Sequence, residues 1–160
     1  MDRLEKVRQV VDEILRQQPD LEERRCGFVH LYGVAQTCAL LAQKRGLDPQ
    51  VCAVMGMLHD IATYRSGDPT NHAPRGAIEA AAILSDTGQF SQQEIDQISQ
   101  AISTHSAKDQ IDGELAELLK DADVLQHDLY NPALYKHPNL QSGQRFQRIM
   151  AELAIEVQDE

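Results

Sequence analysis

The chain of 160 residues is long enough to bury one sizeable hydrophobic core without disulfides or a structural zinc, so residues 1–160 are expected to form a single domain. Aromatic residues make up only 4% and Trp is absent, which argues against a β-sandwich or barrel and favours an all-α fold. The formal net charge of −10, which no run of Lys or Arg offsets locally, would repel a nucleic-acid backbone and excludes a nucleic-acid polymer as the expected partner.

Two helices are predicted at the start of the chain. Residues 2–18 carry apolar side chains at helical spacing between charged ones, which predicts an amphipathic surface helix that Pro19 ends. A second helix is expected from about residue 22 to residue 45, with Gly46 as its C-cap. His30 falls on the buried side of this helix.

An almost wholly apolar stretch, residues 51–58, ends in the adjacent His59 and Asp60. Asp48 and Pro49 supply an N-cap and a proline at the first helical position, so a helix is expected to begin there. A helix that is hydrophobic on all sides lies inside the fold and carries its terminal polar groups into the interior. An imidazole nitrogen and a carboxylate oxygen in one cavity suit a divalent cation. The alternative is a histidine that hydrogen-bonds at a helix end beside a solvent-facing aspartate.

Two further histidines are expected at the edges of apolar helix faces. A turn-rich loop over residues 63–71 leads to His72, which opens a helix rich in small residues. Ser91 and Glu94 have the form of a capping box, and the apolar stripe of the helix that follows extends to His105 at its end. Taken alone, His30 would more often be a hydrogen-bonded core residue than a ligand, but its company with His72 and His105 on or beside apolar helix faces favours a shared site.

The next helix is expected after a loop over residues 106–113, and it carries Asp121 and Asp123 on an apolar pattern. A buried carboxylate is expensive unless it is paired or bound to metal, and helical phase does not choose between the two aspartates. Residues 133–141 are expected to form a loop, and an amphipathic helix with its apolar positions over residues 146–153 completes a set of about six to seven helices.

The dipeptide formed by His127 and Asp128 repeats the first His-Asp pair in a different setting. It follows Gln126 rather than an apolar run and precedes a helix-breaking Asn-Pro sequence, so a largely solvated place at a helix end is expected. His137 lies in a proline-flanked segment and is not counted among the site residues.

The order of His30, the His59-Asp60 pair, and Asp123 within an Asp-Ala-Asp-Val stretch resembles the HD-domain superfamily of metal-dependent phosphohydrolases. The resemblance covers roughly residues 26–130 and implies a compact helical bundle. It also implies that the second aspartate of the stretch is the ligand, which selects Asp123. These four residues are the expected ligands of one divalent ion.

The sequences Asn71-His72-Ala73 and Thr104-His105-Ser106 further resemble the branch of this superfamily that has additional histidines. That branch includes dinucleotide polyphosphate hydrolases and cyclic dinucleotide phosphodiesterases, and it can hold two metals. The resemblance implies that His72 and His105 bind a second ion, with Asp60 as a bridge. Mixed nitrogen and oxygen ligands suit Mn, Fe, Co, Ni or Zn, with Mg as a further candidate. The chain lacks the Gly-Tyr-Pro signature of the cyclic dinucleotide enzymes, so the substrate is left open.

The expected activity is hydrolysis of a phosphoric ester or anhydride. A bound metal lowers the pKa of its water, so that hydroxide is available near neutral pH to attack phosphorus. Asp60 and His59 are the expected catalytic residues, and Asp60 could also accept the proton of the water. Arg75 and Lys108 are the expected phosphate-binding residues because they lie close in sequence to the ligands, whereas Arg65 is expected to be solvated. Solvated loop charges are the alternative for Arg75 and Lys108.

The expected substrate is a small phosphorylated metabolite, and the resemblance implies a nucleotide or dinucleotide. Two other functions stay open: a regulatory module that binds metal and a phosphorylated ligand without turnover, and a structural helical protein with a satisfied polar core. An odd number of Cys without CxxC spacing indicates a reducing compartment. The N-terminal residues have no apolar region of the kind found in a leader, and the longest apolar run is too short for a membrane span. A cytoplasmic protein is expected, and a homodimer is compatible with the sequence.

Overall fold

The structure is a computed structural model that describes residues 2–130 and 140–154. Within these residues the chain forms eight α-helices and no strand, which confirms the prediction of an all-α fold. The helices are α1 (Arg3–Gln17), α2 (Leu21–Arg45), α3 (Pro49–Leu58), α4 (Ile61–Ser66), α5 (His72–Thr87), α6 (Gln92–Thr104), α7 (Glu114–Tyr130) and α8 (Leu140–Leu153).

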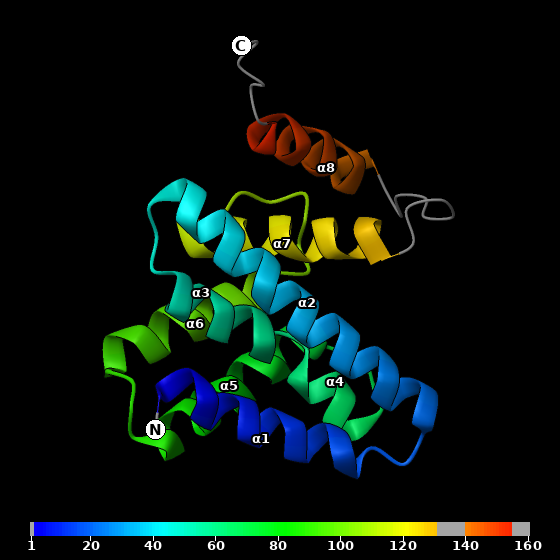
Figure 1. Cartoon of the computed structure of the whole chain (residues 1–160), viewed down its shortest axis with the longest axis vertical. Coiled ribbons are helices and arrows are strands. Elements are labelled where there is room, and N and C mark those ends of the chain that lie inside the picture. Colours follow the sequence, from blue (N-terminus) through cyan, green and yellow to red (C-terminus); the bar gives the residue numbers. More distant parts are fainter. Residues whose placement is uncertain (1, 131–139, 155–160) are drawn as a thin grey trace, which may run out of the picture.

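The helices are layered along the long axis of the molecule (Figure 1). α1 and α8 lie at opposite ends of this axis, and the other helices pack between them. α2 packs along α3 and against α7, and α5 packs against α6. Each of the eight helices contributes buried apolar side chains to one hydrophobic cluster, so α3 and the residues that follow it are enclosed by the rest of the fold.

The central helix α3 is buried along its length, as the apolar pattern predicts. Residues 51–58 are all buried. The side chain of Asp48 accepts hydrogen bonds from the backbone N–H groups of the first turn, and Pro49 occupies the first helical position. α3 ends at Leu58, and the short helix α4 begins at Ile61, directly after Asp60, and extends into the segment that was predicted as loop. The chain therefore changes direction at the His59-Asp60 pair, in the interior of the fold.

The other predicted helix ends are also confirmed. Gly46 follows α2 with a φ of 70°, a left-handed conformation that glycine adopts without strain. At the start of α6, the side chain of Ser91 accepts from the backbone of Glu94, whose carboxylate in turn accepts from the backbone of Ser91. The Gly46 cap fixes the end of α2, and the Ser91 cap fixes the start of α6. Together they determine which residues of these two helices face the interior.

The C-terminal helix α8 differs from its prediction in two details. It begins at Leu140, so positions 140 and 141 are helical rather than part of the predicted loop, while positions 133–139 and His137 lie outside the described residues. Ile149 is fully buried against the core, but Met150, which was placed on the same apolar face, is 43% exposed. The apolar face of α8 is therefore narrower than the sequence pattern indicates.

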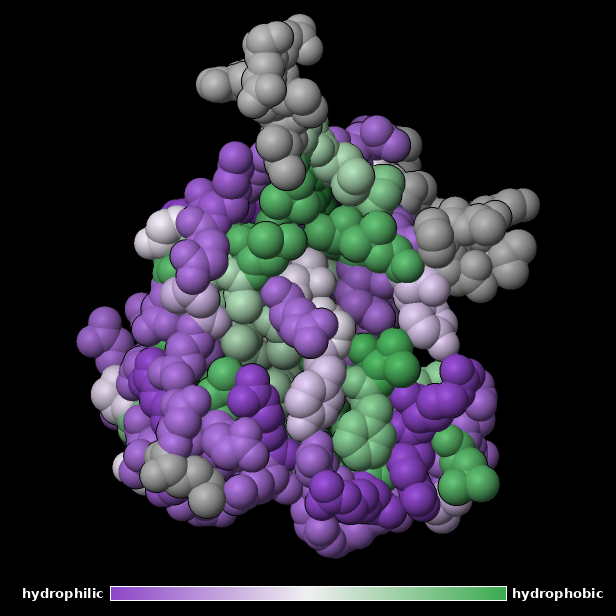
Figure 2. All heavy atoms as spheres, viewed as in Figure 1, coloured by the Kyte–Doolittle hydropathy of each residue, from purple (hydrophilic) through white to green (hydrophobic). Residues whose placement is uncertain are grey.

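The surface is hydrophilic over most of the face seen in Figure 2, and hydrophobic residues gather in the upper part of this view, where α8 meets the helices below it. No helix among the described residues is both long enough and apolar enough to cross a membrane.

Gly76 is a point of close approach that places α5 beside the end of α3. A Cβ atom at this position would lie 2.6 Å from the backbone oxygen of His59, so one of the two helices would have to shift. We predict that Gly76→Ala lowers the free energy of unfolding by about 1–3 kcal/mol, the usual cost of overpacking. Gly113→Ala is the control, because a Cβ there meets nothing within 4 Å, and it should change stability by about 0.5 kcal/mol or less. Equal urea unfolding curves for the two variants would contradict the prediction.

Candidate metal centre

Six side chains singled out in the sequence lie together around the end of α3. They are His30 of α2, His59 and Asp60 between α3 and α4, His72 at the start of α5, His105 at the end of α6, and Asp123 of α7. Their ligand atoms form overlapping groups of three, and within each group the atoms lie within 4.8 Å of one another. Each offers an imidazole nitrogen or a carboxylate oxygen, so this His/Asp cluster could hold metal ions.

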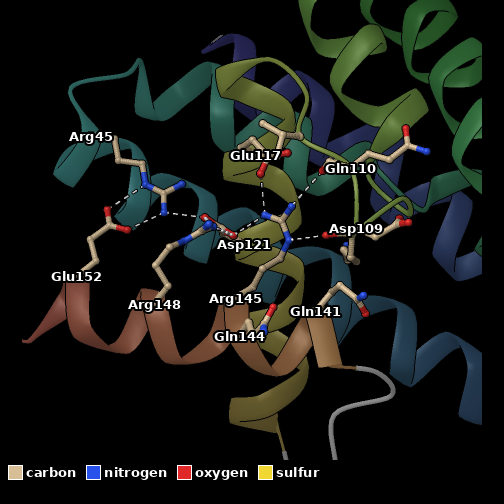
Figure 3. Close-up of a pocket in the computed structure, with 12 residues that line it drawn as sticks. Arg45, Asp109, Gln110, Glu117, Asp121, Gln141, Gln144, Arg145, Arg148 and Glu152 are labelled. Atoms are coloured by element: carbon tan, nitrogen blue, oxygen red, sulfur yellow. Dashed lines mark hydrogen bonds and ion pairs between the residues drawn. The ribbon is translucent and has the colours of Figure 1, made fainter.

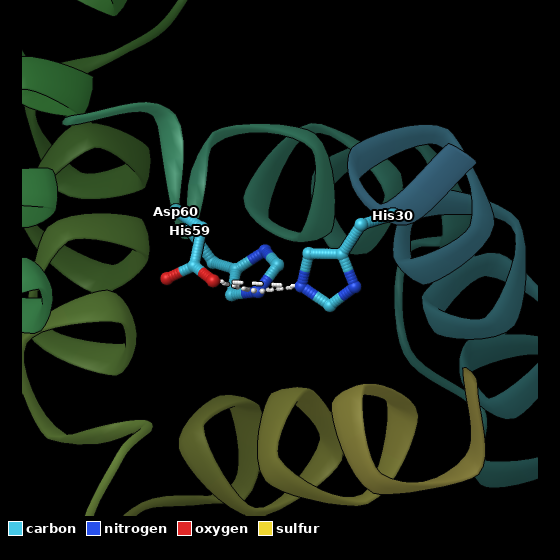
Figure 4. Close-up of side chains that lie close together, drawn as sticks. All are labelled: His30, His59 and Asp60. Atoms are coloured by element: carbon cyan, nitrogen blue, oxygen red, sulfur yellow. Dashed lines mark hydrogen bonds and ion pairs between the residues drawn. The ribbon is translucent and has the colours of Figure 1, made fainter. Parts of the chain in front are cut away.

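One half of the cluster joins α2, α3 and α7. The Nε2 atoms of His30 and His59 lie 3.1 Å apart, and each is 3.4 Å from Oδ2 of Asp60. Figure 4 shows the ring of His30 and the carboxylate of Asp60 directed toward the ring of His59. Oδ1 of Asp123 completes this half, at 3.6 Å from Nε2 of His30 and 3.8 Å from Nε2 of His59.

The other half of the cluster joins α5 and α6 to Asp60. Oδ1 of Asp60 lies 3.3 Å from Nε2 of His105 and 3.6 Å from Nε2 of His72. His105 is buried, whereas 31% of the His72 side chain is exposed. The two oxygens of Asp60 thus face different pairs of imidazoles, which is the arrangement expected of a carboxylate between two ions.

The second nitrogen of each imidazole is held by an oxygen acceptor. The four Nδ1 contacts are His30 with Oε1 of Gln126 at 2.8 Å, His59 with the carbonyl of Gly56 at 2.7 Å, His72 with the carbonyl of Pro69 at 3.1 Å, and His105 with the carbonyl of Ile102 at 2.7 Å. An oxygen acceptor requires a hydrogen on Nδ1, so in the neutral ring the lone pair is on Nε2. All four rings therefore present a lone pair to the cluster, as metal-binding histidines do.

The cluster contains more electron-pair donors than hydrogens. Oδ1 of Asp60 and Oδ1 of Asp123 are buried and have no hydrogen-bond partner among the described residues. Burial raises the pKa of Asp60, but positive charge on His59 and N–H donation from His105, His30 and His59 together outweigh this effect and hold the pKa well below its usual range. When the rings are neutral with their lone pairs on Nε2, this compensation is lost. Buried anions and facing lone pairs need a compensating positive charge, so the donor set fits a divalent cation.

Lys108 supports the cluster from the loop between α6 and α7. Its ammonium donates to Oδ2 of Asp123 at 2.6 Å and to the carbonyl of His105 at 2.8 Å. Burial raises the pKa of Asp123, but the charge of Lys108 together with the neighbouring imidazoles outweighs burial and holds the pKa well below its usual range. Asp123 therefore stays ionised, with Oδ2 engaged by Lys108 and Oδ1 directed at the imidazoles.

Arg75, the other predicted phosphate-binding residue, has its guanidinium over the loop that precedes α5. Its NH1 donates to the carbonyls of Asp68 and Thr70, and its NH2 donates to the hydroxyl of Ser66. These contacts order the loop that leads to His72. Its role toward phosphate stays a prediction, as does that of Lys108.

Asp121, the competitor of Asp123 on α7, faces a different partner. Figure 3 shows its carboxylate directed at the guanidinium groups of Arg45, Arg145 and Arg148, which lie 2.7–2.9 Å away. These residues line a cavity of about 660 Å³ beside α8, away from the rings of the cluster. The structure therefore distinguishes the roles of the two aspartates, which helical phase could not do. Asp121 forms ion pairs with arginines, whereas Asp123 faces imidazoles.

The expectation of a largely solvated His127-Asp128 pair is wrong for Asp128, whereas the His127 side chain is 52% exposed and also contacts the cluster. Asp128 is only 5% exposed. The ring of His127 lies 4.7 Å from the ring of His30, and its Nε2 is 3.4 Å from Oδ1 of Asp123. The spacing of four residues from Asp123 on a helix was the available signal, since such side chains are neighbours. Gln126, which holds His30, was likewise missed in the sequence.

A family model described as HD domain matches residues 27–128. This match spans more than half of the chain, so the chain belongs to the HD-domain family, which confirms the resemblance seen in the sequence. Searches of curated proteins and of solved structures give no significant match. Family membership together with the buried His/Asp cluster indicates a metal-dependent phosphohydrolase.

The two neighbouring aspartates of α7 should respond differently to loss of charge. Asp121→Asn removes a buried anion that contacts three arginines, two of which also pair with Glu152 or Glu117, and breaking a buried ion pair on one side costs about 3–5 kcal/mol. We therefore predict a lower urea midpoint for Asp121→Asn with the metal content of the wild type. Asp123→Asn is the matched comparison and should lose metal. Loss of metal from Asp121→Asn at full helicity would show that the assignment of the two residues is reversed.

Proposed function

We propose that this HD-domain protein hydrolyses a phosphoric ester or anhydride of a small metabolite, with a nucleotide or dinucleotide as the leading substrate class. The observation that carries the proposal is the enclosed set of Nε2 lone pairs around the carboxylate of Asp60. A satisfied structural core has no need for buried acceptors that face one another.

One divalent ion would be held by His30, His59, Asp60 and Asp123, and a second by His72 and His105 with Asp60 as a bridge. Mn, Fe, Co, Ni and Zn suit these ligands, and Mg is a further candidate. Such ions supply two kinds of chemistry, a lower pKa for bound water and stabilisation of charge on phosphoryl oxygens. The separate orientation of the two Asp60 oxygens supports two ions rather than one.

The protein's own groups position and neutralise the reacting atoms. Asp60 and His59 stand at the centre of the cluster, and the Asp60 carboxylate is the expected acceptor for a proton of the water. Its lowered pKa and its proposed place between two ions leave it little basicity for that role. Lys108 keeps Asp123 ionised and has a third N–H donor for a phosphate oxygen. Arg75 keeps its Nε–H for the same purpose, because the hydrogen bonds that it makes to the loop before α5 use NH1 and NH2.

A regulatory module that binds the same ligands without turnover is the competing function. Metal analysis of protein purified without chelator, followed by a screen of phosphorylated metabolites with each candidate metal, separates the two. Metal with hydrolysis supports the enzyme. Metal without turnover supports the module, and protein without metal supports a structural role.

The first test of the ligand set removes the central pair. His59→Ala and Asp60→Ala are each expected to abolish tight metal binding and hydrolysis while the chain stays helical, because the hydrophobic core is independent of the cluster. Leaving a buried partner unsatisfied should also lower stability by about 1–3 kcal/mol. Asp96→Asn, at an exposed position of α6, is the control and should behave as the wild type. Full metal content with normal turnover in either central variant would end the proposal.

The second test concerns the number of ions. The double variant His72→Ala, His105→Ala should bind one ion per chain where the wild type binds two. Loss of one cation removes stabilisation of charge that develops in the transition state, so kcat should fall by a larger factor than KM rises. Native mass spectrometry counts the ions in both proteins. A single ion in the wild type would leave a mononuclear enzyme, in which the two histidines contact only substrate.

A further inference from the structure

A recess of about 170 Å³ opens beside the cluster, between the N-terminal half of α2, the helix α4 and the end of α7. His30 lines this recess and also belongs to the cluster. A group that enters the recess therefore lies next to a proposed metal ligand, and hence next to the place where a phosphoryl group would bind.

The polar side chains of the recess have their partners inside the protein. Nδ1 of His30 lies 2.8 Å from Oε1 of Gln126, and Nε2 of His127 lies 3.4 Å from Oδ1 of Asp123. No Lys or Arg of the described chain lines the recess, so it lacks the positive charge that suits a phosphate. The recess is therefore unsuited to the anionic end of a substrate.

The other walls of the recess are apolar or aromatic. Val29 is 38% exposed and Tyr130 is 52% exposed, so apolar surface meets solvent here. Cys26 also lines the recess, and a free thiol behaves as a small hydrophobic group. Ligand pockets are commonly lined by apolar and aromatic side chains beside a few polar groups. The recess therefore suits an apolar or unsaturated part of a ligand.

Two tyrosines from distant segments supply the aromatic walls. The ring of Tyr64 lies 6.4 Å from the ring of His30, and a Cβ atom at Gly27 would lie 2.9 Å from Cδ1 of Tyr64, so this ring packs directly on the backbone of α2. The hydroxyl of Tyr130 accepts from NH1 of Arg25 at 3.3 Å, which ties the end of α7 to α2. Aromatic rings that are held in place favour stacking or edge contact with another flat ring.

The volume of the recess limits its occupant to one ring. A cavity of about 150 Å³ is sufficient to bind benzene. The recess, at about 170 Å³, thus has room for a single six-membered ring, and a two-ring base would extend out of it.

We propose that this recess binds a flat six-membered ring of the substrate, so that the protein prefers phosphate esters whose organic group carries such a ring. A pyrimidine base and an aryl group share this chemistry. Tyr64 and Tyr130 are then specificity-determining residues. The inference rests on the proposed function and deepens it, because it selects the organic part of the substrate.

The test compares two phosphonates that have the same anionic group and cannot be hydrolysed as esters. Benzylphosphonate has the shape of phenyl phosphate with CH₂ in place of the ester oxygen, and methylphosphonate lacks the ring. Both are titrated by calorimetry into the full-length wild type after its metal content has been measured. Burial of a ring the size of a Phe side chain corresponds to about a tenfold or larger change in Kd, so benzylphosphonate should bind at least about tenfold more tightly.

Two variants locate the effect. Tyr64→Ala removes one wall, and Val29→Trp fills the recess from an exposed position of α2, so that the test stands even where Tyr64→Ala does not fold. Each should lose the preference for benzylphosphonate while the Kd of methylphosphonate and the metal content stay as in the wild type. Leu40→Trp, at an exposed position of the same helix outside the recess, is the matched control and should keep the preference.

A competition experiment separates the two sources of the ring. Uridine monophosphate and adenosine monophosphate are each used to displace benzylphosphonate from the wild type. Stronger displacement by uridine monophosphate supports a pyrimidine base as the occupant, and equal displacement supports an aryl group. Stronger displacement by adenosine monophosphate contradicts the limit to one ring and overturns the inference.

Two further results would overturn the inference and leave the proposed function intact. The first is an equal Kd for the two phosphonates in a wild type that holds metal and hydrolyses p-nitrophenyl phosphate. The second is a ring preference that survives in both Tyr64→Ala and Val29→Trp, which would place the ring elsewhere. A wild type that holds no metal and hydrolyses no ester would refute the proposed function, and the inference would fall with it.

Discussion

The structure is organised around the burial of two carboxylates among imidazole lone pairs. Oδ1 of Asp60 and Oδ1 of Asp123 are buried without a hydrogen-bond partner among the described residues, and the neutral rings of His30, His59, His72 and His105 direct acceptors rather than hydrogens at the cluster. Such a group of atoms is stable only when positive charge lies close to it, and Lys108 supplies one such charge at one oxygen of Asp123. A divalent cation would supply the positive charge that the other donor atoms need.

A local device fixes the direction of three of the four rings. His59, His72 and His105 each direct Nδ1 at the carbonyl of the residue three positions earlier in the chain. His59 and His105 follow the last residues of α3 and α6, where carbonyls have fewer intrahelical partners, although the carbonyl of Ile102 also accepts the backbone N–H of His105. The same contact therefore satisfies a helix end and orients a ring. His30 lies inside a helix, where no such carbonyl is available, and depends on Gln126 from α7 instead.

The sequence was sufficient for most of the helices, because caps and apolar runs are local patterns, whereas α4 was predicted in part as loop. Local patterns also put the cluster histidines on inward faces, but only the family resemblance selected Asp123 over Asp121. Caps such as Asp48 and Ser91 act on neighbouring backbone groups, and an apolar run must be buried wherever it lies. The sequence could not identify the side-chain contacts that are made with distant segments of the chain. Nothing near Asp121 in the sequence indicates three arginines, and nothing near His127 indicates the ring of His30. For that reason local composition placed His127 in solvent.

The contacts of α8 extend the site beyond the residues that the family model matches. Arg145 of α8 donates through Nε to the carbonyl of Lys108 at 3.0 Å and through NH1 to Asp121 at 2.9 Å. Lys108 in turn holds Asp123, so the two aspartates of α7, which face different partners, are linked through one loop residue and one arginine. The fully buried Lys120 holds the same loop by donating to the carbonyl of Gln110. The position of the ammonium beside the cluster therefore depends on packing at the end of the molecule where α8 lies.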